Sequence, residues 1–533
     1  MGDLVVAVDV GTTSARAGVF DLSGRLLAKA RHPILMVRQS DILAEHSSED
    51  IWQATCLAVR AAMGEADIAA ADVKGIGFDA TCSLVLRARD GTPLSVSASG
   101  GAGLDTIVWF DHRAVAQAEA LNATHHPVLR YCGGTISPEM QIPKLMWLKQ
   151  QMPQCWARIG HAFDLADFMT WRATGSAARS RSTLSAKWNF LAHRNEGWDT
   201  DFLAAAGLDD LLERAGLPQS GRAVGDSLGR LTPEAARDLG LCEECLVSPG
   251  IIDAYAGALG ALGGAAARSG ASGDLALIGG TSSCVVSLSS QPVFTNSLWG
   301  PFHGALLPDL WLVEGSQSAA GALLDHIVAM HAAGGEPTAA RHHEIIERIT
   351  LLRQEQAFDF GRSLHILPDF HGNRAPLGDP RATGTIAGLT LDRSFDGLCR
   401  LYWRTCVALS LGIRQILETM IATGHPVETL HLAGGHVQNS HLVELYADAT
   451  GFKIRVPAAP DAVLLGTAMA AAAAAGCFTT LADAASAMDQ GSRLMLPNPA
   501  ARRIYDRDYA RFRAMQRHRA ELAGMDDEAE AVN

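Results

Sequence analysis

Apolar residues gather in short runs that end on polar turns, and two of these regions resemble each other. Residues 4–10 (LVVAVDV) form a near-continuous apolar run, which predicts a strand covered on both faces. A Gly-Thr-Thr turn breaks the run, residues 14–21 alternate, and residues 25–34 return as the second arm of a hairpin. Residues 274–290 repeat the theme as strand, Gly-Gly-Thr-Ser-Ser turn and strand, about 270 residues later. This echo predicts two related lobes.

Other segments carry helix and strand signals. A capping pattern at residues 47–50 predicts a helix, with Ile51, Ala54, Thr55 and Ala58 on one face. A strand at residues 73–78 and a helix from about Ala114 follow. The Gly/Ala-rich stretch 256–273 predicts the boundary between the lobes, so we expect an N-terminal lobe at residues 1–262 and a C-terminal lobe at residues 263–533.

Composition narrows the classes of protein and partner. The chain has 533 residues, of which 48% are hydrophobic and 19% charged, as in a globular protein with sizeable cores. Its net charge is −13, which argues against nucleic acid as the main partner. No apolar run nears the ~20 residues that a membrane span needs, and the alanine tract at 470–475 predicts a short buried helix. Ten scattered cysteines and the lack of a secretory signal predict a cytoplasmic protein with reduced thiols.

Asp9 stands where the first predicted strand enters its glycine and hydroxyl turn. A carboxylate beside exposed backbone N–H groups suits Mg²⁺ together with phosphate. The turn at residues 279–283 has the same character without the acid, and two such turns can grip one polyphosphate. An ordinary hairpin turn is the alternative for the first turn taken alone.

Other familiar motifs are excluded or carry little. The sequence has no Gly-Lys pair and therefore no P-loop of the Walker type. Residues 75–80 match the GxGxxA form of the dinucleotide fingerprint, but a strand-like segment follows instead of a helix. The single CxxC at residues 242–245 has no second pair, so two loop thiols are the better interpretation than a zinc or redox site.

Three further segments hold polar groups where chemistry is expected. Asp253 follows an apolar pair and precedes a small-residue helix, so it is either a base that accepts a hydroxyl proton or a helix N-cap. Residues 368–374 form a loop rich in polar groups. These groups either take part in the chemistry or only hold the loop in shape. Gly434-Gly435 follows a predicted strand, where the backbone can approach a planar ligand or simply turn.

These segments in this order resemble the FGGY family of carbohydrate kinases, over about residues 4–480. The segments that carry the resemblance are DVGTTSARAGVFD, EHSSEDIW, WFDHRA, GGTISPEMQIPKLMWLK, FDLADFMTWRATG, GIIDAYAGALG, GGTSS, WLVEGSQSAAG, LPDFHGNRAPLGD and LAGGHVQN. Any one of them is weak, whereas ten in order are highly specific. Residues 396–405 fit the family's second signature poorly, and we expect them to form a helix beside the nucleotide.

The resemblance implies an α/β fold of two actin-like (ribonuclease H-like) lobes, in the sugar kinase/Hsp70/actin superfamily, with ATP and sugar between them. Each lobe is expected to have a mixed five-stranded sheet in which three antiparallel strands are followed by parallel ones. Asp9 is then expected to order Mg²⁺, directly or through water. The expected nucleotide-binding residues are Thr12, Thr13, Gly280, Thr281, Ser282, Gly434, Gly435 and Asn439.

The resemblance also implies a substrate. Asp253 matches the catalytic base, and Lys187 and Glu314 match substrate contacts of ribulokinase-like members. Lys187 could instead be a surface lysine, and Glu314 could instead support the base. Residues 81–85 resemble the segment typical of D-ribulokinases, which predicts that Asp79, Thr81 and Cys82 bind the sugar, with Cys82 as a pocket wall and not a nucleophile.

The expected reaction is ATP-dependent phosphorylation of D-ribulose to D-ribulose 5-phosphate. L-ribulose or another pentulose or polyol is the alternative substrate. A non-catalytic, nucleotide-gated regulator on the same fold is the alternative from another class. The family often forms homodimers, and the resemblance implies neither a nucleic-acid nor a membrane partner.

Overall fold

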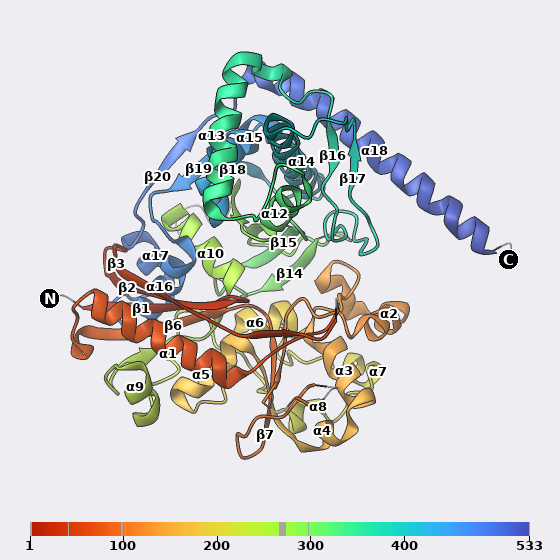
Figure 1. Ribbon diagram of the computed structural model, residues 1–533. Helices are drawn as coiled ribbons and strands as arrows, with labels where there is room; N and C mark the ends of the chain where they lie inside the picture. The colour runs from red at the N-terminus through yellow and green to blue at the C-terminus, as the bar shows by residue number, and fades with distance from the viewer. Residues whose placement is uncertain are drawn as a thin grey trace. The chain divides into compact units, whose positions relative to one another are not determined.

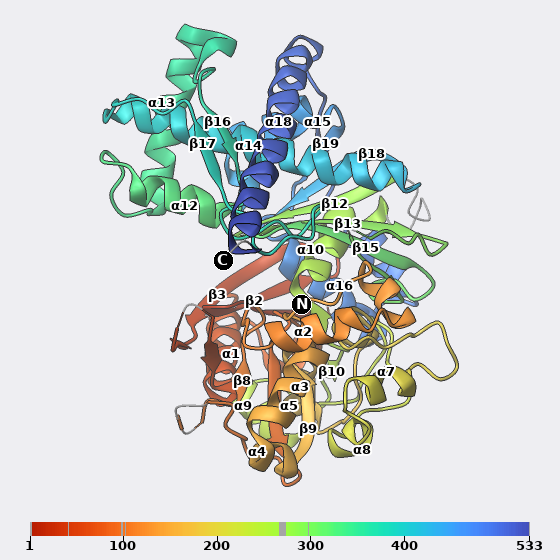
Figure 2. The same cartoon turned by 90° about the vertical axis from the view of Figure 1, so that its right-hand side faces the viewer.

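The computed structural model describes residues 3–40, 42–97, 100–101, 103–265, 273–296 and 298–531. Contacts within the chain divide it into two compact units (Figures 1 and 2). Unit 1 comprises Met1–Ser272, Val286–Val313 and Pro457–Gly491, and unit 2 comprises Gly273–Val285, Glu314–Val456 and Ser492–Asn533. The lobe boundary at residues 262 and 263 stays a prediction, because part of the stretch around it, residues 266–272, lies outside the described residues.

The main sheet of unit 1 has the predicted order of antiparallel strands followed by parallel ones. Its strands run β10-β6-β1-β2-β3, and β11 also pairs with β6. The pairs β1–β2 and β2–β3 are antiparallel, whereas β1, β10 and β11 are parallel to β6. The strands are β1 (Leu4–Val10), β2 (Ser14–Asp21), β3 (Leu26–Pro33), β6 (Val73–Ala80), β10 (Leu246–Val247) and β11 (Ile251–Ile252).

Helices cover both faces of this sheet (Figure 1). On one face α1 (Ser48–Glu65), α5 (Leu165–Thr174) and α9 (Pro233–Leu239) enclose a core with the alternate side chains of β1. On the other face lie α10 (Asp253–Leu262) and α16 (Ala462–Ala474), as expected for a buried alanine tract. A Cβ on Gly260 or Gly466 would lie 1.9 Å from a backbone oxygen of the facing helix, so α10 and α16 pack backbone to backbone.

A second sheet in unit 1 was not predicted. Its order is β4-β5-β8-β7-β9, and its four strand pairs are antiparallel. Two of its five strands have only three residues and one has two, so their alternation is too brief to register as a sequence pattern. The strands are β4 (Met36–Arg38), β5 (Ala44–His46), β7 (Leu84–Ala88), β8 (Thr106–Ile107) and β9 (Ile159–Asp164).

Further helices of unit 1 pack around this second sheet or beside α16. The helix expected near Ala114 is α2, for which Ala114 is the N-cap. The remaining helices are α2 (Val115–Ala123), α3 (Gln141–Gln151), α4 (Pro153–Arg158), α6 (Arg181–Lys187), α7 (Thr200–Ala205), α8 (Leu211–Arg214) and α17 (Leu481–Ala487).

The sheet of the C-terminal half has seven strands, so the prediction of five is wrong. Its order is β14-β15-β13-β12-β18-β19-β20, with β12, β18 and β19 parallel. By contact, β14 belongs to unit 1, and β13 and β15 run from one unit into the other. The strands are β12 (Gly273–Gly279), β13 (Ser283–Ser289), β14 (Trp299–His303), β15 (Trp311–Gln317), β18 (Val427–Ala433), β19 (Lys453–Pro457) and β20 (Ser492–Met495).

Unit 2 is completed by helices and a short hairpin. Helix α14 lies against α12, α13, α15 and α18 (Figure 2). The elements are α12 (Gly321–Met330), α13 (Ala339–Gln356), β16 (His365–Leu367), β17 (Thr385–Ala387), α14 (Phe395–Ala422), α15 (Ser440–Thr450) and α18 (Pro499–Ala531). The helix expected at residues 396–405 is therefore confirmed as part of α14.

Among the described residues, α14 is the one helix long and apolar enough to cross a membrane, although the sequence analysis found no such run. Of its most apolar window, 78% is buried inside the protein. This burial is typical of a core helix, and length and composition alone are weak evidence for a span.

Candidate functional site

Three aspartates come together in unit 1 because three neighbouring strands of its main sheet are parallel. Asp9 on β1 pairs in register with Asp79 on β6. On the other side of β6, Ile251 pairs with Asp79, and Asp253 begins α10 directly after β11. Ligand sites of parallel sheets form at this carboxyl edge. The sheet therefore delivers three acids, far apart in sequence, to one edge.

Asp9 is held by a cation that the sequence analysis overlooked. Its side chain is buried, and its Oδ2 accepts a hydrogen bond from Nη2 of Arg16 on β2. The same guanidinium reaches Oδ2 of Asp461 at 3.2 Å. Register could have revealed the first contact, since Asp9 and Arg16 face each other across β1 and β2.

The turn after Asp9 has the character expected for phosphate contacts. Gly11 N donates to Ser14 O at 3.0 Å, while Thr12 is partly exposed and Thr13 is exposed. Trp109 Nε1 donates to Thr12 Oγ1 at 3.1 Å. Mg²⁺ commonly binds through one or two carboxylates plus water and phosphate oxygens, and Asp9 beside this turn fits that requirement. Among the described residues, no group of three or more His, Cys, Asp or Glu side chains forms a further candidate metal site.

Asp79 is the most deeply buried of the three acids. Its side chain is 0% exposed and its Oδ2 accepts a 2.5 Å hydrogen bond from Thr467 Oγ1 on α16, whereas Oδ1 has no partner among the described residues. Burial, with the charge of Asp253 as a further cause, raises the pKa of Asp79 well above its usual value. One oxygen of the Asp79 carboxyl is therefore engaged by α16. The role of Asp79 in binding sugar stays a prediction.

Asp253, the predicted base, lies at the same edge of the sheet. It is the first residue of α10, it is only partly buried, and its Oδ1 accepts a 2.7 Å hydrogen bond from Ala254 N. The N-cap is Ile252, so the alternative that made Asp253 the N-cap is wrong. A carboxylate in the first helical turn is stabilised by the helix dipole.

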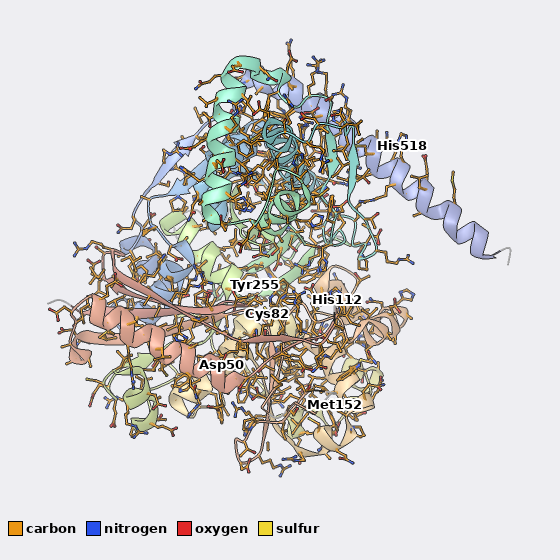
Figure 3. The ribbon with its side chains drawn as sticks, viewed as in Figure 1. Asp50, Cys82, His112, Met152, Tyr255 and His518 are labelled. Carbon is orange, nitrogen blue, oxygen red and sulfur yellow. The ribbon has the colours of Figure 1, made fainter. Side chains whose placement is uncertain are left out.

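The segment after β6 is fastened from several sides. Thr81 N donates to Val10 O at 3.1 Å, Leu165 N donates to Ser83 O at 2.9 Å, and Thr81 Oγ1 lies 3.2 Å from Ser83 Oγ. The polar residues that interrupt this apolar stretch thus have hydrogen-bond partners, as buried polar groups must. Cys82, marked in Figure 3, is 8% exposed and a free thiol. Figure 3 also marks Tyr255, which follows Asp253 on α10.

Lys187 ends α6 and is 7% exposed, so the alternative of a surface lysine is wrong. Its Nζ lies 4.4 Å from the centroid of the Trp299 ring on β14, a cation–π contact. Its charge also lowers the pKa of Asp164, the last residue of β9, against a larger rise from burial. The net effect raises the pKa of Asp164 to about 7.

Asp164→Asn is expected to gain stability relative to the wild type as pH rises. The raised pKa means that the folded protein keeps the Asp164 proton while the unfolded chain loses it near pH 4. Stability from this group therefore falls between about pH 4 and 7, on the order of 1 kcal/mol per pH unit, and the variant lacks this loss. Thermal unfolding of both proteins from pH 5 to 8 measures it. Parallel curves for the two proteins would contradict the prediction.

The turn between β12 and β13 in unit 2 is docked on the start of α12. Gly280 O accepts from Gly321 N at 2.9 Å, and Thr281 O accepts from Ala320 N at 2.8 Å. Inside the turn, Gly280 N donates to Ser282 O at 2.9 Å. Thr281 is exposed and Ser282 is partly exposed, as contacts to a phosphate require.

The predicted nucleotide-binding glycines lie beside that turn. β12 and β18 pair in register at Ile278 and Ala433, so Gly434 follows directly next to Gly279. Gly434 has a φ of +82°, and a Cβ on it would lie 2.4 Å from Gly279 O. The close approach leaves room for no side chain, which explains the glycine.

Asn439 caps α15, because its Oδ1 accepts from His441 N at 3.1 Å and from Leu442 N at 3.3 Å. The strand predicted before Gly434 is confirmed as β18, and a 3₁₀ turn at Gly435–Gln438 follows it. Unit 2 thus brings five of the predicted nucleotide-binding residues onto two neighbouring strand ends, with Asn439 at the helix that follows.

Glu314 lies within β15. The loop at residues 368–374 has a structural network: Asp369 Oδ1 accepts from Asn373 Nδ2 at 2.9 Å, and Asp369 Oδ2 accepts from Arg519 Nη1 at 2.5 Å. Those contacts favour the structural interpretation of the loop. Cys242 and Cys245 are free thiols.

Comparison with known proteins decides the family. Residues 4–260 match the N-terminal domain of the FGGY family of carbohydrate kinases, and residues 275–475 match its C-terminal domain. The chain belongs to the FGGY family of carbohydrate kinases. An FGGY carbohydrate kinase domain-containing protein of Danio rerio is 41% identical over 98% of both chains. A D-ribulokinase of Saccharomyces cerevisiae is 36% identical over 89% of this chain and 72% of its own.

A solved FGGY-type structure confirms the fold. Ligand-bound xylulose kinase from Lactobacillus acidophilus superposes with a TM-score of 0.80 at 18% identity, covering 97% of this chain and 98% of that one. The two-lobed, actin-like sugar kinase fold is therefore confirmed, and the chain is a carbohydrate kinase. FGGY kinases use ATP as phosphate donor, generally with Mg²⁺.

Proposed function

We propose that this FGGY kinase phosphorylates D-ribulose, giving D-ribulose 5-phosphate and ADP. The observation that carries the substrate is the segment Thr81-Cys82-Ser83, fixed after β6 at the edge that also bears Asp253. The similarity to a D-ribulokinase of yeast over most of both chains supports the same substrate. L-ribulose and other pentuloses or polyols are the competing substrates.

The base of the reaction is Asp253. An alcohol has a pKa far above 7, so its proton must be taken as the new bond to phosphorus forms. The hydrogen bond from Ala254 N fixes one carboxylate oxygen, and the dipole of α10 favours a negative charge at its first turn. Asp253 orients the hydroxyl and receives its proton, while the sugar oxygen becomes bonded to the γ-phosphorus and ADP leaves.

Lys187 and Glu314 serve as sugar contacts in this proposal. Lys187 is a buried cation with an aromatic neighbour, Trp299, and such a group makes directional hydrogen bonds to hydroxyls. Glu314, on β15, accepts hydrogen bonds from hydroxyl donors. Cys82 forms part of the wall of the sugar pocket. Its side chain is buried and in no disulfide, and its main chain is held in place.

The nucleotide is assigned to the turns. In unit 1, Thr12 and Thr13 offer hydroxyls beside Asp9, and in unit 2, Gly280, Thr281 and Ser282 offer backbone and hydroxyl donors. Gly434, Gly435 and Asn439 border the adenosine. Asp9 is the residue that would hold Mg²⁺, directly or through water, and the bound ion would supply positive charge to neutralise the transferring phosphate. Arg16 then keeps Asp9 oriented from the other side.

An ATP-coupled assay over D-ribulose, L-ribulose, D-xylulose, ribitol and glycerol tests the proposal. We expect the highest kcat/KM with D-ribulose, by at least tenfold over the next sugar. Identification of the product as the 5-phosphate by ³¹P and ¹³C NMR completes the measurement. A higher kcat/KM with another sugar would replace D-ribulose, and no sugar-dependent ADP release from any of them would refute all of these substrates.

A further inference from the structure

One face of helix α3 reaches into the region of unit 1 that holds the predicted sugar contacts. Gln141 and Lys144 lie three residues apart on α3, and side chains at this spacing share a face. Both side chains are 0% exposed. Polar side chains buried this deeply need hydrogen-bond partners, and the identity of those partners shows what the helix holds.

Gln141 connects the Thr81–Ser83 segment to β9. Its Nε2 donates to Cys82 O at 3.1 Å and to Asp164 Oδ2 at 2.9 Å. The carbonyl of Cys82 is therefore fixed by a side chain that lies about 60 residues away in sequence. Leu165 N, one residue after Asp164, donates to Ser83 O at 2.9 Å, so the two bonds fix adjacent carbonyls.

Lys144 holds a second segment in the same way. Its Nζ donates to Val108 O at 3.1 Å and to Trp109 O at 3.0 Å. Trp109 in turn donates from its backbone N to Ser83 Oγ at 3.2 Å and from Nε1 to Thr12 Oγ1 at 3.1 Å. The main chain at residue 109 thus lies between Lys144 on one side and the Thr81–Ser83 segment and the turn after β1 on the other.

The partners of these two side chains are informative. Three of the four hydrogen bonds end on main-chain carbonyls of segments without regular structure or at their junctions, where the backbone lacks ladder partners. Burial lowers the pKa of Lys144 to about 8, although the charges of Asp111 and Glu139 act to raise it. Through its two hydrogen bonds the ammonium fixes the main chain at residues 108 and 109, which an apolar side chain could not do.

We propose that Gln141 and Lys144 are positioning residues that set sugar selectivity, by fixing the Cys82 and Trp109 main chains as two walls of the sugar pocket. This inference rests on the proposed function, because it takes the Thr81–Ser83 segment as part of the sugar site. Selectivity between epimers depends on hydroxyls meeting fixed partners, so a wall that moves by a fraction of an ångström admits the wrong epimer. α3 would then influence which sugar is accepted without contacting the sugar itself.

The test compares Gln141→Met and Lys144→Met with Gln151→Met, a matched change at an exposed position of the same helix. Each variant is assayed with D-ribulose and with the next-best sugar. For the first two variants we expect KM for D-ribulose to rise at least tenfold and the selectivity ratio to fall at least fivefold. We expect kcat at saturation within threefold and KM for ATP within twofold of the wild type, and no change for Gln151→Met.

Two further variants keep the test decisive if the methionine variants fail to fold. Gln141→Glu keeps the size of the side chain and removes the Nε2 donor, so it must also lower the selectivity ratio. Lys144→Arg keeps donors for the two carbonyls and must recover part of the lost selectivity. A merely structural role would instead lower the unfolding temperature and leave the selectivity ratio unchanged in every folded variant, which would overturn the proposal. If the wild type phosphorylates none of the sugars, the proposed function fails; if it does and the ratio stays constant, only this inference fails.

Discussion

Asp253→Asn is expected to lower kcat for sugar phosphorylation by ~10³-fold or more, because a general base contributes about 10²–10⁴-fold and the carboxamide cannot accept the proton. Asparagine has nearly the same shape, and its Oδ1 can still accept the hydrogen bond that Ala254 N donates in the native protein. The first turn of α10 should therefore be undisturbed. The affinity for ATP, measured by calorimetry without sugar, is expected to stay within about twofold.

The control for Asp253→Asn is Asp201→Asn, which removes an exposed carboxylate on α7 of the same unit. Its turnover and ATP affinity should match those of the wild type. Near-normal turnover of Asp253→Asn would exclude Asp253 as the base. A loss of ATP binding together with turnover would point to a structural role of the carboxylate at the start of α10.

Gly434→Ala is expected to raise KM for ATP at least tenfold. The new Cβ would lie 2.4 Å from Gly279 O, a backbone atom that cannot turn away, so the strand ends of β12 and β18 must separate. A tenfold change corresponds to ~1.4 kcal/mol, which is within the usual range for backbone strain of this kind. Steady-state kinetics with ATP varied at saturating sugar measures the effect, and KM for the sugar is expected to change little.

Gly424→Ala separates the two causes of strain in Gly434→Ala. Gly424 also has a positive φ, +99°, but a Cβ there has nothing within 4 Å. It therefore bears the conformational penalty without the clash, and its KM for ATP should equal that of the wild type. Equal effects of the two substitutions would show that the close approach of Gly434 to Gly279 does not shape the nucleotide site.

Strands with long apolar runs could be predicted from the sequence. The candidate site residues at the ends of these strands could then be predicted as well. The run at residues 4–10 and its echo at 274–290 predicted both hairpins, since a strand covered on two faces leaves a short apolar run and here each run ends on a glycine turn. Asp9 was found because it lies near the end of such a run, and Asp253 and Gly434 because each directly follows a strand.

Contacts between distant segments could not be predicted in this way. Arg16 was overlooked, although the register of β1 and β2 places it opposite Asp9. Gln141 and Lys144 were also overlooked as parts of the site, because their partners include carbonyls of irregular segments, which leave no periodic pattern. The sheet β4-β5-β8-β7-β9 escaped for a similar reason, since several of its strands are held by register with neighbours rather than by their own composition. The roles of the site residues stay predictions until the variants are assayed.

The order in which the ribosome makes the chain gives α16 a special place. The chain passes between the units after residues 272, 285, 313, 456 and 491, so unit 1 receives Pro457–Gly491 only after most of unit 2 has been synthesised. Until then β6 lacks the helix against which Gly75 and Gly77 pack, and Asp79 lacks Thr467. A nascent N-terminal half therefore has α10 on this face of its sheet but lacks α16. The edge that bears the three aspartates is thus completed late in synthesis, and a fragment ending near residue 262 would never complete it.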